Sequence, residues 1–219
     1  MSTFSKSDDQ EASLYDAVLD EISTGRLEAG QRLKVSELAN RFGVSTSPVR
    51  EVLRLLQGEG FVEIHPNRGA VVKQADANTI QNIFEVLQLL EPYFVSWFAD
   101  YAQPEMIEEM EDIQRRIEEL PTADLIAFRK LDIEFHWAIC RQHYNHVAAD
   151  LWRKLRTALN VHGAKLRISP VRYQTIMEEH RELIAAFKAH DAARAEAAIN
   201  KHVAGSFTQM SQQMRALGI

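Results

Sequence analysis

The uneven spacing of glycine is the feature that most limits how this chain can fold. Six of its nine glycines lie at or before position 69, and none lies between Gly69 and Gly163. Glycine marks turns and the ends of elements, so the first third of the chain is expected to hold short elements and the rest long helices. This shift predicts two domains, which cover residues 1–74 and 75–219.

The first domain is expected to contain three helices. Apolar residues at helical spacing predict them over residues 14–22, 36–42 and 48–58. Ser36 and Ser47 are the expected N-caps of the second and third helices, because serine accepts hydrogen bonds from the first free N–H groups. The third helix is expected to begin at a proline, which suits the first helical position.

Two short β-type runs follow these helices, over residues 61–65 and 70–72, with a turn between them. Three helices followed by a hairpin outline a winged helix-turn-helix. In that fold, the second helix of the helix-turn-helix enters the major groove of DNA.

The second domain shows only helical periodicity. Prolines and short polar breaks divide it into six predicted helices, over residues 79–101, 104–119, 122–143, 145–166, 171–189 and 191–216. Helices joined by such short loops pack antiparallel in a bundle. The predicted fold is therefore mainly α, with an N-terminal winged helix-turn-helix followed by an all-α antiparallel six-helix bundle.

Groups that bind DNA gather at the start of the third predicted helix. Hydroxyl groups and helix N-terminal amides can donate hydrogen bonds to phosphate oxygens there, and Arg50, one turn later, can reach a guanine edge or a phosphate. Arg68, beside Gly69 at the hairpin tip, is expected in the minor groove or at a phosphate. The candidate DNA-binding residues are Lys34, Ser36, Ser45, Thr46, Ser47, Arg50, Arg54, Arg68 and Gly69.

Local charge supports this hypothesis. Residues 25–73 contain eight Lys and Arg against five Glu, a balance of +3, whereas the whole chain carries a formal charge of −6. A basic patch of this kind attracts the DNA backbone. The alternative interpretation is a small helical domain whose charges are solvated, because the helix-turn-helix outline also occurs in proteins that do not bind DNA.

A carboxylate and three histidines lie on or beside the apolar stripes of three predicted helices. They are Asp132, His136, His180 and His202. Asp132 and His136 are four residues apart and so share one helix face, while His180 lies at the centre of an apolar stripe. Taken singly, each histidine is better explained as a hydrogen-bonded core residue. Together, a carboxylate and three imidazoles favour a divalent transition metal with positions left for water or a ligand.

The N-terminal segments resemble the GntR family of bacterial transcription regulators. The resemblance rests on Gly30-Gln31-Arg32-Leu33, Ser36-Glu37-Leu38-Ala39, Pro48-Val49-Arg50-Glu51-Val52-Leu53 and Arg68-Gly69-Ala70-Val71-Val72, and it covers about residues 12–73. It implies a DNA-binding regulator. This chain has Thr46 where the family usually has an arginine, so operator binding is expected to depend more on Arg50 and the wing.

The segment 79–214 resembles the all-helical FCD effector domain of the FadR-type subfamily, in its six-helix, VanR-like form. The resemblance rests on Leu89-Leu90-Glu91-Pro92, Asp132-Ile133-Glu134-Phe135-His136, Glu179-His180-Arg181-Glu182-Leu183 and His202. It implies that Asp132 and the three histidines bind a metal. Zinc is the first choice, with nickel or manganese as alternatives.

The resemblance also implies a small organic acid as effector. The family often carries an inward arginine on the first effector-domain helix, and Leu87 occupies that place here. Leu87 and His162 are the candidate residues of the effector pocket. The loss of the arginine leaves the metal itself as the expected partner of the acid group.

The predicted function is a ligand-responsive, metal-containing repressor that binds a palindromic operator as a homodimer. The alternatives are a metal-dependent enzyme on a helical bundle, which lacks an obvious general base, and a regulator that senses the metal itself. The polar N-terminus has no signal-peptide region, no apolar run reaches the length of a membrane span, and Cys140 is the only cysteine. A cytoplasmic protein is therefore expected.

Overall fold

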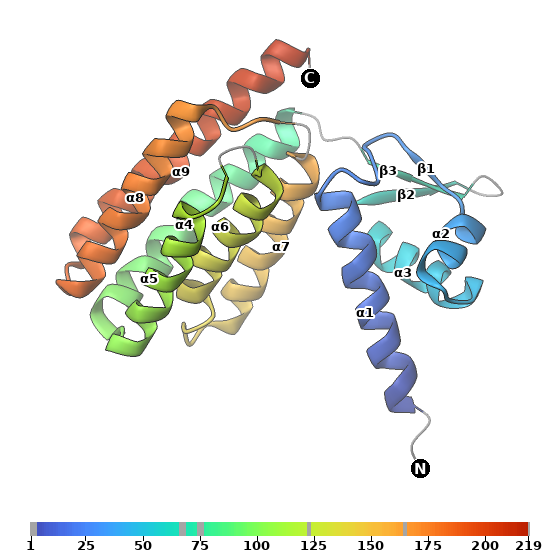
Figure 1. Ribbon diagram of the computed structural model, residues 1–219, viewed down its shortest axis with the longest axis horizontal. Coiled ribbons are helices and arrows are strands. Elements are labelled where there is room, and N and C mark those ends of the chain that lie inside the picture. Colours follow the sequence, from blue (N-terminus) through green and yellow to red (C-terminus); the bar gives the residue numbers. More distant parts are fainter. Residues whose placement is uncertain (1–3, 66–68, 74–76, 122–123, 164–165, 219) are drawn as a thin grey trace. The chain divides into compact units, whose positions relative to one another are not determined.

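The computed structural model describes residues 4–65, 69–73, 77–121, 124–163 and 166–218, and the burial of side chains from Ser13 onward. The chain forms two compact units that divide near residue 75 (Figure 1). A small unit with a sheet is followed by a helical unit, so the predicted fold class is confirmed. No helix in the described ranges is long and apolar enough to cross a membrane.

The N-terminal unit combines three helices with a three-stranded sheet. Its elements are α1 (Phe4–Ser23), β1 (Arg32–Leu33), α2 (Val35–Phe42), α3 (Thr46–Gly58), β2 (Val62–His65) and β3 (Gly69–Val72). The sheet is antiparallel, with β3 between β1 and β2. Helix α3 is anchored by one apolar face, formed by Val49, Val52, Leu53 and Leu56. Its opposite face remains open to solvent.

Three local expectations for this unit were wrong. Helix α2 is preceded by Lys34 as N-cap, so Ser36 lies inside the helix. Helix α3 is preceded by Ser45, which places Ser47 in its first turn. A proline is tolerated throughout the first turn, because those N–H groups have no acceptor within the helix, and the proline therefore did not mark the first residue. Strand β1 was missed because two residues show no periodicity.

The second unit is a bundle of six long helices in the part of the chain that the structure describes. They are α4 (Ala77–Tyr101), α5 (Pro104–Glu118), α6 (Leu125–Cys140), α7 (His146–His162), α8 (Pro170–Lys188) and α9 (Ala192–Leu217). Each predicted helix has its counterpart, although α6 is shorter than expected and α7 ends at His162 instead of residue 166. The side chain of Asp124 accepts a hydrogen bond from the Ala127 N–H, which caps α6 at that point.

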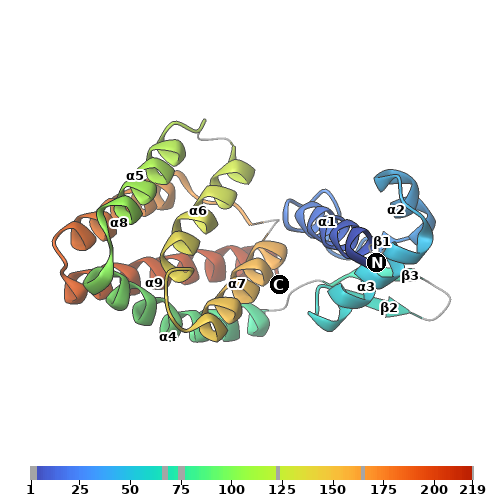
Figure 2. The same ribbon diagram turned by 90° about the horizontal axis from the view of Figure 1, so that it is seen from below.

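The bundle core is rich in aromatic side chains. Helix α9 packs along α4 and α8, and α5 packs against α6 and α8 (Figure 2). The rings of Phe98 on α4 and Phe187 on α8 lie 4.7 Å apart, edge to face. Trp152 on α7 is fully buried and donates a hydrogen bond from Nε1 to the buried Glu91 on α4 at 3.0 Å. Helices α8 and α9 therefore lie side by side, and α5 lies between α6 and α8 as a common neighbour.

Candidate DNA-binding face and metal centre

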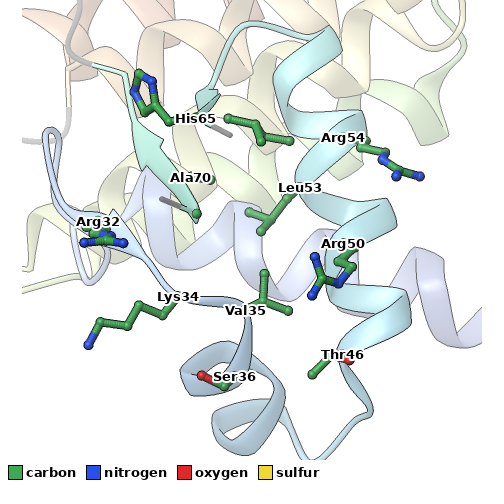
Figure 3. Close-up of a pocket in the computed structure, with 12 residues that line it drawn as sticks. Arg32, Lys34, Val35, Ser36, Thr46, Arg50, Leu53, Arg54, His65 and Ala70 are labelled. Carbon is green, nitrogen blue, oxygen red and sulfur yellow. The ribbon is translucent and has the colours of Figure 1, made fainter. Parts of the chain in front are cut away.

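A groove of about 570 Å³ lies on the N-terminal unit, between β1, α3 and the hairpin (Figure 3). It is lined by Arg32, Lys34, Val35, Ser36, Thr46, Arg50, Leu53, Arg54, Ile64, His65, Gly69 and Ala70. The lining contains three arginines and a lysine but no Asp or Glu. The groove is therefore a cationic surface suited to phosphate oxygens.

The groove includes six of the predicted DNA-binding residues: Lys34, Ser36, Thr46, Arg50, Arg54 and Gly69. Ser45 and Ser47 flank Thr46 and are exposed, but they are not among the lining residues. Arg68 lies outside the described residues. The structure therefore gathers most of the predicted set on one face.

The cations of the groove differ in how they are held. Lys34 pairs with Glu37 at 2.6 Å, and Arg54 pairs with Glu51 at 2.7 Å. Arg50 forms no ion pair with any residue that the structure describes, and its side chain points from α3 into the groove (Figure 3). Arg50 can thus bind an external partner without first breaking an ion pair to a described residue.

The N-terminus of α3 is also open to an external acceptor. Ser45 occupies the N-cap position, but its side chain makes no capping hydrogen bond. The first N–H groups of the helix are therefore free of a side-chain acceptor. Such groups bind anions, and the helix dipole strengthens the interaction.

Sequence reasoning missed the two other basic residues of this face, Arg32 and His65. Both are placed by the sheet, in which Arg32 pairs with Val71 and His65 pairs with Gly69. Gly69 has a φ of +82°, and a Cβ at this position would lie 2.7 Å from the carbonyl oxygen of Leu33. Only glycine therefore allows β1 to approach the hairpin this closely. The pairing, and with it the position of Arg32, is a property of the folded sheet.

In the helical unit, the structure brings the four predicted metal ligands together. Asp132 and His136 come from α6, His180 from α8 and His202 from α9. One ligand atom from each residue lies within 4.8 Å of the others. The three histidines are buried and Asp132 is partly buried. The four side chains therefore share one small volume in the core.

Several atoms that face this volume lack hydrogen bonds. Oδ1 of Asp132, Nε2 of His136 and Nε2 of His180 are buried and make no hydrogen bond to a described residue. Oδ1 of Asp132 lies 3.5 Å from Nε2 of His180. Buried polar atoms are almost always paired, so three such atoms in one place need a common partner. A metal ion bound to these atoms would be such a partner.

Neighbouring residues set the orientation of two imidazoles. Nδ1 of His180 lies 2.9 Å from Oε1 of Gln114, and Nδ1 of His202 lies 3.0 Å from Oε2 of Glu179. Each oxygen accepts only, so Nδ1 carries the proton and Nε2 keeps the lone pair that a metal requires. The Gln114 amide is itself oriented, because its Nε2 donates to Glu118 at 2.6 Å.

The electrostatics of the centre keep the imidazoles of His136 and His180 neutral. Burial, followed by the positive charge of Arg156 and the neighbouring imidazoles, holds the pKa of His136 well below its usual value. Burial, followed by His202, Arg156 and Arg172, also holds the pKa of His180 well below its usual value. Neutral imidazole is the form that binds metals.

The residues present fit a divalent transition metal. Three imidazole nitrogens and one carboxylate oxygen form a donor set that Zn²⁺, Ni²⁺ and Mn²⁺ accept. The carboxylate and imidazoles are held by further buried polar groups, as in known metal centres. The supporting residues Gln114, Arg156 and Glu179 were missed from the sequence. The one usable signal was Glu179, which directly precedes His180.

The two candidate effector-pocket residues are not in the cluster. Leu87 is fully buried on α4, where it contributes an apolar side chain to the core. His162 ends α7 and is half-buried. One buried cation beside the four ligands is instead Arg156 on α7, which donates from Nη2 to Oδ2 of Asp132 at 2.6 Å.

Comparisons with known proteins give a family match for each of the two units. The family described as "Bacterial regulatory proteins, gntR family" matches residues 10–72, and the family described as "FCD domain" matches residues 82–205. The two matches cover the groove and all four clustered ligands.

Relatives and solved structures match over most of the chain. The HTH-type transcriptional regulator LutR of Bacillus subtilis is 28% identical, with 83% of this chain and 92% of the relative covered. The gluconate operon transcriptional repressor of Bacillus licheniformis is 25% identical, with 78% and 72% covered. The structure of E. coli McbR/YncC superposes with a TM-score of 0.81 at 20% identity and covers 93% of this chain and 97% of that one. This last likeness concerns the fold alone.

Proposed function

Because the chain belongs to the GntR family of bacterial transcription regulators and carries an FCD domain, we propose that it is a metal-containing repressor which a small organic acid releases from its operator. Like the relatives named above, which are transcription regulators, it is a DNA-binding regulator and not an enzyme. One observation carries the finer proposal: a cationic groove and a cluster of metal ligands with unpaired buried atoms occur in the same chain.

The groove on the N-terminal unit is the proposed operator contact. Arg50 would bind a guanine edge or a phosphate, and the open N-terminus of α3 would bind a phosphate. Lys34 and Arg54 would exchange their carboxylate partners for phosphates, at little cost because both pairs are exposed. Binding would therefore be strongly dependent on salt concentration.

The proposed metal is zinc, with nickel and manganese as alternatives. Asp132, His136, His180 and His202 would hold it, and the ion would supply a Lewis-acidic position for an oxygen of the effector. Leu87 offers no charge to an acid, so the ion and the neighbouring Arg156 are the available cationic groups. The gluconate operon repressor among the relatives is a precedent for a regulator of organic-acid use.

A second copy of the chain is the proposed partner of the helical unit. Large apolar side chains are exposed along α4 and α7, including Leu89 at 75% and Val147 at 81%. Tyr93 on α4 and Tyr144 just before α7 join these helices through their hydroxyl groups, 3.0 Å apart. We call Leu89, Tyr93, Tyr144, Val147 and Leu151 the α4–α7 face. Exposed patches of this kind mark interaction sites, and a dimer would present two DNA-reading units to a palindromic operator.

Release by the effector requires two states of the protein. The effector and the operator must prefer different states, and regulators of this kind need a coupling free energy of roughly 1–3 kcal/mol. Helices α6, α8 and α9 contribute the ligands, so a bound acid would act first on the packing of these three helices.

The experiment has two steps. Operator DNA is selected from a random library with the zinc-loaded protein, and its affinity is then measured by fluorescence anisotropy with and without zinc. A thermal-shift screen of small organic acids on the zinc-loaded protein identifies the effector, because a ligand of the native state raises the melting temperature. An acid that raises it and weakens operator binding supports the proposal. Operator binding that follows zinc alone, with no response to any acid, identifies a metal sensor instead.

A further inference from the structure

Arg172 is a buried cation next to the proposed metal centre that the ligand set leaves unexplained. It lies in the first turn of α8, and its guanidinium makes three contacts. Nη1 lies 2.9 Å from Oε2 of Glu179. Nη2 donates to the carbonyl oxygen of His202 at 2.8 Å and to Oγ of Ser206 at 3.0 Å. The Arg172 side chain thus contacts Glu179, the partner of the proposed ligand His202, and also the backbone of His202.

Arg172 and His202 bind the same carboxylate oxygen. Oε2 of Glu179 accepts from Nδ1 of His202 at 3.0 Å and also faces Nη1 of Arg172. Burial opposes the charge of Glu179, but the hydrogen bond from His202 and the charge of Arg172 lower the pKa of the carboxyl on balance. A carboxylate behind a ligating imidazole orients the ring and raises its basicity.

The imidazole of His180 also has a hydrogen-bond partner at Nδ1, but this partner forms a weaker hydrogen bond. Nδ1 of His180 donates to the amide oxygen of Gln114, which is neutral. Hydrogen bonds to a charged acceptor are about twice as strong as those to a neutral one. His202 is therefore the histidine whose orientation is most firmly held, provided that Arg172 keeps Glu179 in place.

A glycine on α9 makes room for this arrangement. A Cβ added at Gly205 would lie 2.6 Å from Nη1 and 2.9 Å from Cζ of Arg172. Glycine inside a helix is unfavourable, so its presence within α9 calls for a local reason. Because Gly205 has no side chain, the guanidinium of Arg172 can occupy the space beside it. An alanine at position 205 would therefore press first on Arg172, whose guanidinium atoms are the three nearest neighbours of the added Cβ.

We propose that Arg172 is a positioning residue of the metal centre. Arg172 holds the Glu179 carboxylate against Nδ1 of His202, so that Nε2 of His202 is directed to the ion. Gly205 leaves the space that the Arg172 guanidinium occupies. This inference rests on the proposed metal-binding function. A purely structural clamp between α8 and α9 would involve the same contacts but would affect stability and leave metal affinity unchanged.

The test measures Zn²⁺ affinity of the full chain by competition with a chromophoric chelator. Gly205→Ala and Glu179→Gln are each expected to weaken Zn²⁺ binding by about 10–100-fold, the effect typical of residues behind the ligands. Gly58→Ala is the matched control, because a Cβ there meets nothing within 4 Å. The visible absorption of the Co²⁺-loaded protein should change in the first two variants and not in the control.

A double-mutant cycle tests whether Gly205→Ala acts through Arg172. On an Arg172→Ala background, Gly205→Ala should change Zn²⁺ affinity by no more than about 2-fold, because the displaced group is already gone. Wild-type affinity and an unchanged Co²⁺ spectrum in Gly205→Ala and Glu179→Gln would overturn this inference while the metal proposal stood. If the wild-type chain itself binds no Zn²⁺, Co²⁺, Ni²⁺ or Mn²⁺, both fail.

Discussion

Arg156 forms a hydrogen bond with only one of the two carboxylate oxygens of Asp132. Nη2 of Arg156 donates to Oδ2 at 2.6 Å, while Oδ1 is left without a hydrogen bond among the described residues. The same guanidinium lies 3.8 Å from the buried Glu91, so one cation offsets two carboxylates from different helices. The free oxygen of Asp132 is thereby held toward the three imidazoles.

The first prediction concerns this cation. Arg156→Met should destabilise the metal-free protein by about 3–5 kcal/mol, because two largely buried carboxylates lose their counter-charge. Zinc should then raise the melting temperature of the variant more than that of the wild type, since the ion replaces the lost charge. Thermal unfolding with and without zinc measures both effects. Lys154→Met, on the exposed side of the same helix, is the control and should change neither. Equal zinc-induced shifts in Arg156→Met and wild type would contradict the prediction.

The second prediction concerns the ligands themselves. His180→Ala and His202→Ala should each lower the bound metal per chain while leaving a folded protein, because each removes one donor atom from the cluster. Elemental analysis of the purified variants, with circular dichroism to verify folding, measures this. His162→Ala serves as the control, because His162 lies outside the cluster. Full metal content in both ligand variants would remove these histidines from the centre.

The third prediction concerns the groove. Arg50→Ala should weaken operator binding by about 1–3 kcal/mol and relax its sequence preference, because Arg50 points into the groove without an internal ion pair. Fluorescence anisotropy at several salt concentrations gives both the affinity and its salt dependence. Arg41→Ala is a suitable comparison, since Arg41 pairs with Glu21 at 2.7 Å and does not line the groove. If Arg50→Ala binds as tightly as wild type, the assigned DNA-binding face is wrong.

The fourth prediction concerns the α4–α7 face. Val147→Glu should shift the protein from dimer to monomer, because it places a charge in the centre of the proposed apolar contact. Analytical ultracentrifugation at micromolar concentration measures the shift, and operator affinity should fall with it. Val171→Glu provides a matched control, since Val171 is 78% exposed and belongs to α8, not to the α4–α7 face. A dimer that survives Val147→Glu would place the second copy elsewhere.

Sequence reasoning succeeded where the signal was local. Helical periodicity placed all six helices of the second domain, and the four-residue spacing of Asp132 and His136 placed both on one face of α6. It failed at boundaries where two local signals competed. Ser36 and Ser47 were chosen as caps although Lys34 and Ser45 precede the helices, because a serine or proline is acceptable at several positions of a first turn.

What the sequence determined by itself was the kind of element at each position and the face on which each candidate ligand lies. The tertiary structure alone decided which faces meet. It set Glu179 against His202, Gln114 against His180 and Arg156 against Asp132, across separations of 23, 66 and 24 residues. The physical reason is that periodicity records only whether a side chain is buried, whereas the partner of a buried polar group is selected by the packing of helices distant in the chain.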